Sequence, residues 1–228
     1  MGITKVNKID DYVKVRNVII SVSDKTGLDK LVSSLVEINP EIKIFSTGGT
    51  FNSIKNIIQE KAEKNLIQIS DYTGQPETQG GLVKTLDFKI YLGILTETYN
   101  ESHQSDIART NAVTMDMVIV NLYPFETVIK TEGIDLEDAR GNIDIGGPCM
   151  IRAASKNFLR VAPVVDPVDY EAIIYFLSNN KCTTNLKFRY SLAVKAFEHV
   201  AEYDKNIAQY LKNTGNREGV FDCYKINN

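Results

Sequence analysis

The sequence predicts an α/β protein built on a mostly parallel β-sheet. Short apolar runs rich in β-branched residues alternate with amphipathic stripes of helical period along most of the 228 residues. Strands that are apolar at every position are typical of parallel sheets covered by helices on both faces. We expect this domain over 15–180, after an N-terminal tail over 1–14, and a C-terminal helical segment over 181–228.

Two units of strand, polar loop and helix open the domain. The first unit has an apolar run over 17–22, the loop SDKTG, and the helical stripe Leu28, Leu31, Val32, Leu35 and Val36. The second has a strand over 42–45, the loop STGGT, and the stripe Phe51, Ile54, Ile57 and Ile58. A short strand over 66–69 follows. The turn-rich passage over 70–81 is too long for a plain connection, so we expect a functional loop there.

The second half of the chain continues the alternation. Ile94 and Leu95 end either a strand or a helix, and a strand is predicted over 117–120. Helices are predicted over 136–139 and over 148–156, the latter with Pro148 in its first turn. The apolar run over 161–165 is predicted to be an edge strand because Pro163 cannot donate to a sheet ladder. A stripe over 186–211 predicts a final helix.

Composition excludes several classes of function. Twenty-six Lys and Arg against 29 Asp and Glu give a net charge of −3, which provides no positive field for a nucleic acid. No apolar stretch approaches the roughly 20 residues of a membrane span, and the N-terminus lacks the apolar core of a signal peptide, so we expect a cytosolic protein. Three scattered Cys and two His predict reduced thiols and no metal site. Chemistry must then depend on Lys, Asp, Tyr and the backbone.

The loops SDKTG and STGGT are candidate phosphate cradles. Each leaves a strand and enters a helix, where free N–H groups and the positive end of the helix dipole favour an anion. In a parallel sheet both loops lie at the same edge. The alternative is that Ser23, Asp24 and Ser46 are ordinary helix caps and the glycines ordinary turn residues.

Three further motifs contain groups that are able to bind or transfer protons. Lys84 and Thr85 follow a glycine pair, and Tyr123 leaves the strand over 117–120. Asp144 precedes the pair Gly146-Gly147 and a helix that ends near Lys156, so the spacing permits an Asp144–Lys156 contact without establishing it. Each group also has a structural alternative, namely a surface lysine, a surface tyrosine or a capping aspartate. His103 and His199 are expected to be structural.

Taken together, the motifs SVSDKTG, STGGT, SDYTG-x-PE, VKTL, VNLYPF and NIDIGGP-x-MIRAASKN resemble the inosine monophosphate (IMP) cyclohydrolase domain. That domain forms the N-terminal half of a bifunctional purine-biosynthesis protein whose other half is an aminoimidazole carboxamide ribonucleotide formyltransferase. The resemblance covers 16–170. It implies a three-layer methylglyoxal-synthase-like fold, a homodimer, no cofactor, and dehydrative closure of the formylated carboxamide ribonucleotide to IMP.

The resemblance also implies roles for matching residues. Lys25, Ser46, Gly48, Gly49 and Thr50 would hold the 5′-phosphate and ribose, and the substrate would also contact Ser23, Thr85, Asn121, Ile145, Gly146 and Gly147. The catalytic residues would be Lys84, Tyr123, Asp144 and Lys156. Asp144, paired with Lys156, would deprotonate the carboxamide. Lys84 and Tyr123 would stabilise or protonate the formyl oxygen.

The chain departs from the family pattern around VKTL. Leu82 replaces an arginine, Asp87-Phe88 replaces His-Pro, and Tyr91 replaces a histidine. A missing charge-assisted hydrogen bond removes about 1.5–3 kcal/mol of binding. The alternative function is therefore a purine-nucleotide-binding module with weakened or lost turnover. A third, a phosphate eliminator of the methylglyoxal-synthase type, needs a histidine and aspartate arrangement that the chain does not show.

The sequence contains no segment like the RYGENPHQ that leads into the formyltransferase half of the family. We therefore expect no formyltransferase activity from this chain. Whether it is a stand-alone protein or a fragment stays open.

Overall fold

The computed structural model describes residues 5–75, 84–214, 220 and 223–225. Within them lies a sheet of five parallel strands in the order β4-β3-β2-β5-β6. The strands are β2 (Asn17–Val22), β3 (Lys43–Ser46), β4 (Leu66–Gln68), β5 (Met117–Asn121) and β6 (Ala162–Val164). Ile19 of central strand β2 lies opposite Phe45 on one side and Val118 on the other. The predicted α/β class is confirmed, and so is the edge position of the strand that contains Pro163.

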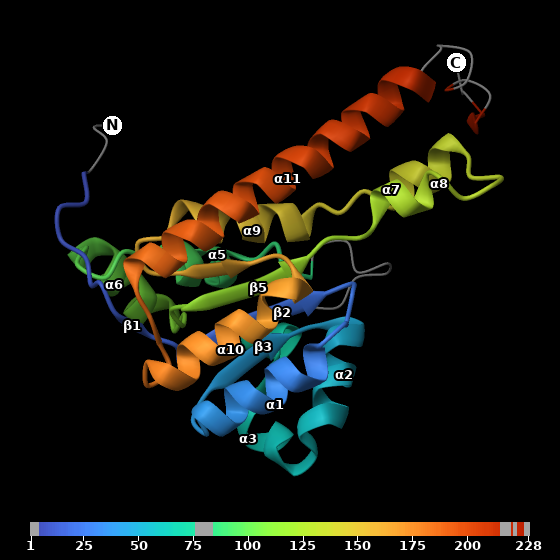
Figure 1. Ribbon diagram of the computed structural model, residues 1–228. Coiled ribbons are helices and arrows are strands. Elements are labelled where there is room, and N and C mark those ends of the chain that lie inside the picture. Colours follow the sequence, from blue (N-terminus) through green and yellow to red (C-terminus); the bar gives the residue numbers. More distant parts are fainter. Residues whose placement is uncertain (1–4, 76–83, 215–219, 221–222, 226–228) are drawn as a thin grey trace.

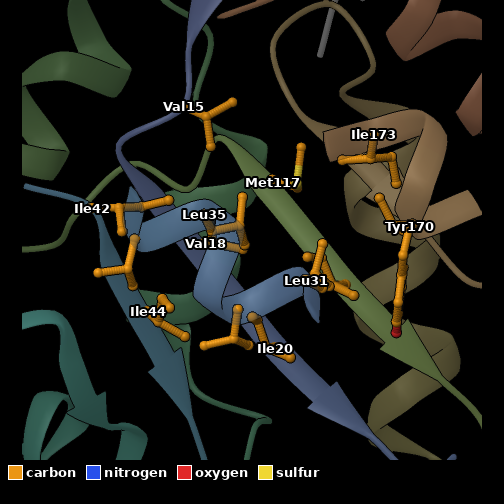
Figure 2. Close-up of a cluster of buried hydrophobic side chains, with 14 of the residues drawn as sticks. Val15, Val18, Ile20, Leu31, Leu35, Ile42, Ile44, Met117, Tyr170 and Ile173 are labelled. Atoms are coloured by element: carbon orange, nitrogen blue, oxygen red, sulfur yellow. The ribbon is translucent and has the colours of Figure 1, made fainter. Parts of the chain in front are cut away.

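One face of the sheet is covered by α1 (Leu28–Ile38), α2 (Gly48–Ile58) and α10 (Tyr170–Asn179). Alternate residues of a strand point to the same face, so Val18 and Ile20 of β2 both enter this core. Figure 2 shows them beside Leu31 and Leu35 of α1, in a cluster that also includes Ile173 of α10. All five side chains are completely buried. The stripe that predicted α1 is the face with which that helix packs.

The opposite face is covered by α5 (Phe88–Leu95), α9 (Gly146–Lys156) and α11 (Leu186–Thr214) (Figure 1). Ile19 and Val118 point this way and share a core with Met150 of α9 and with Ala196 and Val200 of α11. Because strands β2 and β5 are buried on both faces, they read as continuous apolar runs. Helix α11, in the predicted C-terminal segment, is therefore one of the layers that cover the sheet.

Shorter elements join these layers. They are η1 (Gln59–Lys61), α3 (Ala62–Asn65), α4 (Ile69–Thr73), α6 (Glu101–Thr110), α7 (Phe125–Val128), α8 (Leu136–Gly141) and η3 (Pro167–Asp169). Strand β1 (Val13–Lys14) pairs antiparallel with β7 (Thr183–Thr184). None of the helices in the described parts of the chain is long and apolar enough to cross a membrane.

The structure corrects the sequence interpretation at two places and decides between the alternatives at a third. Strand β3 ends at Ser46 and helix α2 already begins at Gly48, so only Thr47 of STGGT lies between them. Residues 70–73 belong to α4, and of the expected functional loop only Gly74 and Gln75 are otherwise described. Ile94 and Leu95 end a helix, α5. Helix α6 escaped prediction because no residue in it is fully buried, so its sequence has no apolar stripe.

A buried ion pair holds the amino ends of three strands together. Arg160, just before β6, donates to Asp116, just before β5, at 2.9 Å, and both side chains are less than a tenth exposed. The other carboxylate oxygen of Asp116 accepts the backbone N–H groups of Arg16 and Asn17 at the start of β2. Arg160 also donates to the carbonyls of Gly93, Thr96 and Met115. We call this arrangement the amino-end clamp.

We predict that Asp116→Ala lowers the free energy of unfolding by about 3–5 kcal/mol, because it leaves a buried guanidinium without its counter-charge. Urea unfolding followed by circular dichroism measures the change. The matched control is Asp106→Ala, which removes the exposed partner of Arg109 and should cost less than about 1 kcal/mol. Equal losses in the two variants would contradict a special role for the clamp.

Candidate active site

A cavity of about 650 Å³ opens at the carboxyl ends of the parallel strands. The loops after β2, β3 and β5 and the start of α9 meet there, because all strands of a parallel sheet end at the same edge. Most of the predicted site residues line it: Ser23, Lys25, Gly48, Gly49, Thr50, Lys84, Thr85, Asn121, Tyr123, Asp144, Ile145, Gly146 and Gly147. Ser46 and Lys156 are the predicted residues that do not.

The side-chain amide of Asn121 fixes the SDKTG loop. Its oxygen accepts the N–H groups of Ser23 and Asp24 at 2.6 and 2.9 Å, and its nitrogen donates to the carbonyl of Asp24 at 2.8 Å. The carboxylate of Asp24 accepts both donors of Thr26, and these hydrogen bonds lower the pKa of Asp24. Asp24 thus shapes the turn, while the exposed Lys25 lines the cavity.

Two of the three hydroxyls of STGGT are used inside the fold. The Ser46 hydroxyl is fully buried and donates to the carbonyl of Ile20 at 2.7 Å. The Thr50 hydroxyl donates to the carbonyl of Val22 and accepts its N–H, so it ties α2 to β2. The cap position of α2, Thr47, makes no side-chain capping hydrogen bond. An anion in the cavity would therefore meet the N–H groups of the first turn of α2, not these hydroxyls.

Lys84 lies against this helix start. A Cβ placed on Gly48 would lie 3.8 Å from the Lys84 ammonium nitrogen. Gly48 has a φ of 55°, a left-handed conformation that glycine adopts without strain. The ammonium group and the positive end of the α2 dipole thus converge on one region of the cavity, which favours a negatively charged ligand there.

Asp144 is held from two sides at the start of α9. Its backbone N–H donates to the Tyr203 hydroxyl of α11 at 2.8 Å, and its Oδ1 accepts the N–H of Gly147 at 3.0 Å. Burial raises the pKa of the carboxyl, and the Gly147 hydrogen bond partly opposes this. Within the described residues, Oδ2 makes no hydrogen bond. A half-buried carboxyl with a free oxygen and a raised pKa suits proton transfer. Asp144 is therefore able to cap the start of α9 with one oxygen and to take part in proton transfer with the other.

The glycine pair that follows Asp144 is required by packing. A Cβ on Gly146 would lie 2.6 Å from the Thr85 hydroxyl oxygen. One on Gly147 would lie 2.5 Å from Oδ2 of Asp144 and 2.7 Å from Leu122. These close approaches bring the VKTL and DIGGP segments together at the cavity wall.

The structure does not bring Lys156 to the cavity. Asp144 precedes the first turn of α9 and Lys156 is its last residue, so a helix of 11 residues, roughly 16 Å long, separates them. Lys156 is exposed and lines a different hollow of about 250 Å³ with Glu97 and His103. The expected Asp144–Lys156 contact is absent within the chain, because a side chain that leans back along a helix covers only about one turn.

The departures from the family pattern have partial structural explanations. Asp87 is buried and caps α5 by accepting the N–H of Lys89 at 2.7 Å. Phe88 is the first residue of α5 and is 61% exposed. Tyr91 packs into the α9 side of the core. Leu82, like Gly80 and Gly81, lies outside the described residues.

The remaining candidate groups lie away from the cavity. His103 Nδ1 accepts the N–H of Glu97, and burial lowers the pKa of His199. Cys149, Cys182 and Cys223 are all unpaired thiols. In the described part of the chain, no group of three or more His, Cys, Asp or Glu side chains is placed to hold a metal ion.

Sequence reasoning missed some of the cavity lining. Ser21, Thr47, Asn142, Ile143 and Met150 also line it. A signal existed for two of them, because Asn142 and Ile143 directly precede Asp144. Met150 lies four residues after Gly146 in α9 and so shares its face.

Comparisons with known proteins divide the chain into two regions. A family model described as "MGS-like domain" matches 27–149, and one described as "AICARFT/IMPCHase bienzyme" matches 154–227. The "Bifunctional purine biosynthesis protein PurH" of Acetivibrio thermocellus is 45% identical over 198 residues, which cover 87% of this chain and 37% of that protein. Its counterpart in Ruminiclostridium cellulolyticum is 44% identical over 200 residues. The chain thus spans less than two fifths of these relatives.

A solved structure is similar over nearly its whole length. "Crystal structure of ForH" superposes with a TM-score of 0.72 at 29% identity, covering 85% of this chain and 97% of that one.

We predict that Gly147→Ala destabilises the protein by about 1–3 kcal/mol, because the methyl group displaces Asp144 or Leu122. The matched control is Gly49→Ala in α2, where a Cβ meets nothing within 4 Å. That change should leave stability unchanged or raise it by up to about 1 kcal/mol. Urea midpoints of both variants check the prediction. A Gly147→Ala protein as stable as the control would contradict the close packing.

Proposed function

The chain belongs to the MGS-like domain family, whose model matches more than half of it, and from this premise we propose that it is an IMP cyclohydrolase. The proposed reaction closes 5-formamidoimidazole-4-carboxamide ribonucleotide to IMP with loss of water, a step of purine biosynthesis. The observation that carries the proposal is the single cavity that gathers Lys84, Tyr123 and Asp144 next to the N-terminus of α2. Similarity to proteins named for purine biosynthesis supports it.

In this proposal the helix start binds the phosphate. The N–H groups of Gly48 and Gly49 and the ammonium of Lys25 hold it, because they are the anion-binding groups on that side of the cavity. Ser46 and Thr50 support these groups from below through their hydrogen bonds to β2. The purine-forming end of the substrate then faces the start of α9.

The chemistry is an intramolecular condensation. The carboxamide nitrogen gives one proton to Asp144 as its bond to the formyl carbon forms. Lys84 or Tyr123 protonates the formyl oxygen to a hydroxyl, and the proton taken up by Asp144 is then passed to that hydroxyl, which leaves as water. As the C=N bond forms, the formamide nitrogen returns its proton to Lys84 or Tyr123. One water is lost and nothing is oxidised. Holding the two reacting groups in contact supplies much of the acceleration, and charge stabilisation at the formyl oxygen supplies more.

One observation favours the alternative, a nucleotide-binding module with weakened or lost turnover. Within the chain, the cavity lacks Lys156, one of the four residues to which the resemblance assigned the chemistry. Such a module binds IMP but does not accelerate ring closure. Incubating the protein with the formylated ribonucleotide and following purine absorbance in the ultraviolet separates the two. Binding of IMP by calorimetry without acceleration would reject the enzyme in favour of the module.

We also propose a homodimer in the cytosol, as the resemblance implies. Helix α9 has an exposed face that is available to pack against a second copy of the chain. It contains Cys149, Arg152 and Lys156, which are spaced three and four residues apart. Two α9 helices packed antiparallel about a two-fold axis near Arg152 would place the Lys156 of each beside the start of the other helix. Lys156 would then serve the cavity of the other copy. Light scattering measures the mass.

We predict that Lys84→Ala and Asp144→Ala each lower turnover at least about tenfold while the fold stays intact. The matched control is Lys89→Ala, whose ammonium contacts the carbonyl of Tyr72 outside the cavity. That variant should keep wild-type turnover. Wild-type rates in Lys84→Ala or Asp144→Ala, with unchanged circular dichroism, would remove that residue from the mechanism.

We predict that Lys156→Ala also lowers turnover, and that mixing it with an inactive Asp144→Asn protein restores about a quarter of wild-type activity. Half of all dimers are then mixed, and each mixed dimer contains one intact site out of two. Full activity of Lys156→Ala alone would exclude the lysine from the mechanism. No recovery on mixing would show that Lys156 acts inside its own chain.

A further inference from the structure

The hydroxyl of Tyr91 has no nitrogen or oxygen partner among the described residues. Tyr91 lies on α5, its ring packs against the core on the α9 side of the sheet, and its oxygen is enclosed within the protein. An enclosed hydroxyl left unpaired costs about 1–3 kcal/mol, so such a group calls for an explanation. The residue also stands where the resembled family has a histidine.

Two groups lie near the Tyr91 hydroxyl, the thiol of Cys149 and the carboxyl of Asp144. Burial is the main cause that raises the pKa of Tyr91, the charge of Cys149 and a hydrogen-bonding contact with its thiol raise it further, and the charge of Asp144 adds the smallest contribution. The phenol therefore keeps its proton and is a hydrogen-bond donor throughout the physiological range. Helices α5 and α9 pack against each other, with Tyr91 on α5, Cys149 on α9 and Asp144 two residues before α9.

Asp144 is the better acceptor of the two. Thiol sulfur accepts hydrogen bonds weakly, whereas an ionised carboxylate accepts them strongly. Oδ1 of Asp144 is already bonded to the N–H of Gly147, and Oδ2 makes no hydrogen bond among the described residues. Tyr91 is not part of the described cavity lining, whereas Asp144 is. Tyr91 can thus influence a bound ligand only through its neighbour.

We infer that Tyr91 is a positioning residue for Asp144: its O–H donates to Oδ2 whenever the carboxyl is ionised. With Gly147 on one oxygen and Tyr91 on the other, the carboxylate plane is fixed toward the cavity. The part of this inference that concerns catalysis rests on the proposed function, since it takes Asp144 as the base. The hydrogen bond itself does not depend on that function.

The Tyr91 hydrogen bond makes the carboxyl of Asp144 a stronger acid. Burial disfavours the charged carboxylate, and a donor to its oxygen favours it, so the Tyr91 hydrogen bond lowers the pKa of Asp144 relative to a protein without it. The other titratable groups around Asp144 are Tyr203 on α11, Cys149 on α9 and, across the cavity, Lys84. A tyrosine stays neutral from pH 5 to 8, unlike a histidine.

The test follows the ionisation of Asp144 itself. Carboxyl carbon NMR of the full chain labelled with 13C-aspartate gives the midpoint, with the Asp144 signal assigned from its loss in Asp144→Asn. We expect Tyr91→Phe, which keeps the ring, to raise the midpoint by about one pH unit, since a charge-assisted hydrogen bond is worth about that much. Tyr91→His, which restores a donor, should return it toward the wild-type value. Cys149→Ala should leave it unchanged.

An unmoved midpoint in a folded Tyr91→Phe protein would overturn the inference, and so would an equal shift in Cys149→Ala. A purely structural Tyr91 would change the unfolding midpoint in urea and leave the titration in place. Kinetics add a second readout: the acid limb of kcat/KM should move to higher pH in Tyr91→Phe, with less than about a twofold loss at pH 8. If the wild-type protein shows no turnover, the proposed ring-closure activity is rejected. The NMR titration still tests the role of Tyr91 in that case.

Discussion

The buried pair of Asp116 and Arg160 is the constraint on which the cavity depends, although it lies at the opposite end of the sheet. By holding the first residues of β2, β5 and β6 together, it fixes where each strand starts. Because the register between β2 and β5 is fixed, the carboxyl ends of the two strands are also fixed relative to each other. Asn121 at the end of β5 therefore contacts the loop after β2. The position of the anion-binding loops is thereby set by an ion pair that is not part of the lining of this cavity.

The polar groups at the carboxyl edge divide into supporting and available ones. Three side chains form their hydrogen bonds with neighbouring backbone groups: Ser46, Thr50 and Asn121. The groups left for a ligand include helix-terminal N–H groups, the ammonium ions of Lys25 and Lys84, the Tyr123 hydroxyl and one oxygen of Asp144. Fixed dipoles and charges of this kind need little rearrangement when a ligand binds, which is the condition for strong electrostatic stabilisation.

Much of the fold was predictable because its central strands are buried on both faces and its main helices have one apolar stripe. Helix α6 could not be found this way, since it has no fully buried residue. At the site, the motifs gave the right residues for one cavity, because parallel strands bring their ends together. They could not show that Lys156 lies a full helix away, nor that the SDKTG loop is tied to Asn121 almost 100 positions later, because spacing along a chain does not give distances through space.

The hydrogen bond from Asp144 to Tyr203 has a consequence for how such proteins evolve. Asp144 belongs to the region that matches the MGS-like domain, and Tyr203 to the region that matches the bienzyme model. The backbone at Asp144 is therefore held by a residue from outside the region that matches the MGS-like domain. Substitutions of Tyr203 that remove its hydroxyl would break this contact whatever side chain stands at position 144, and an MGS-like unit transplanted without the long helix would arrive with it missing.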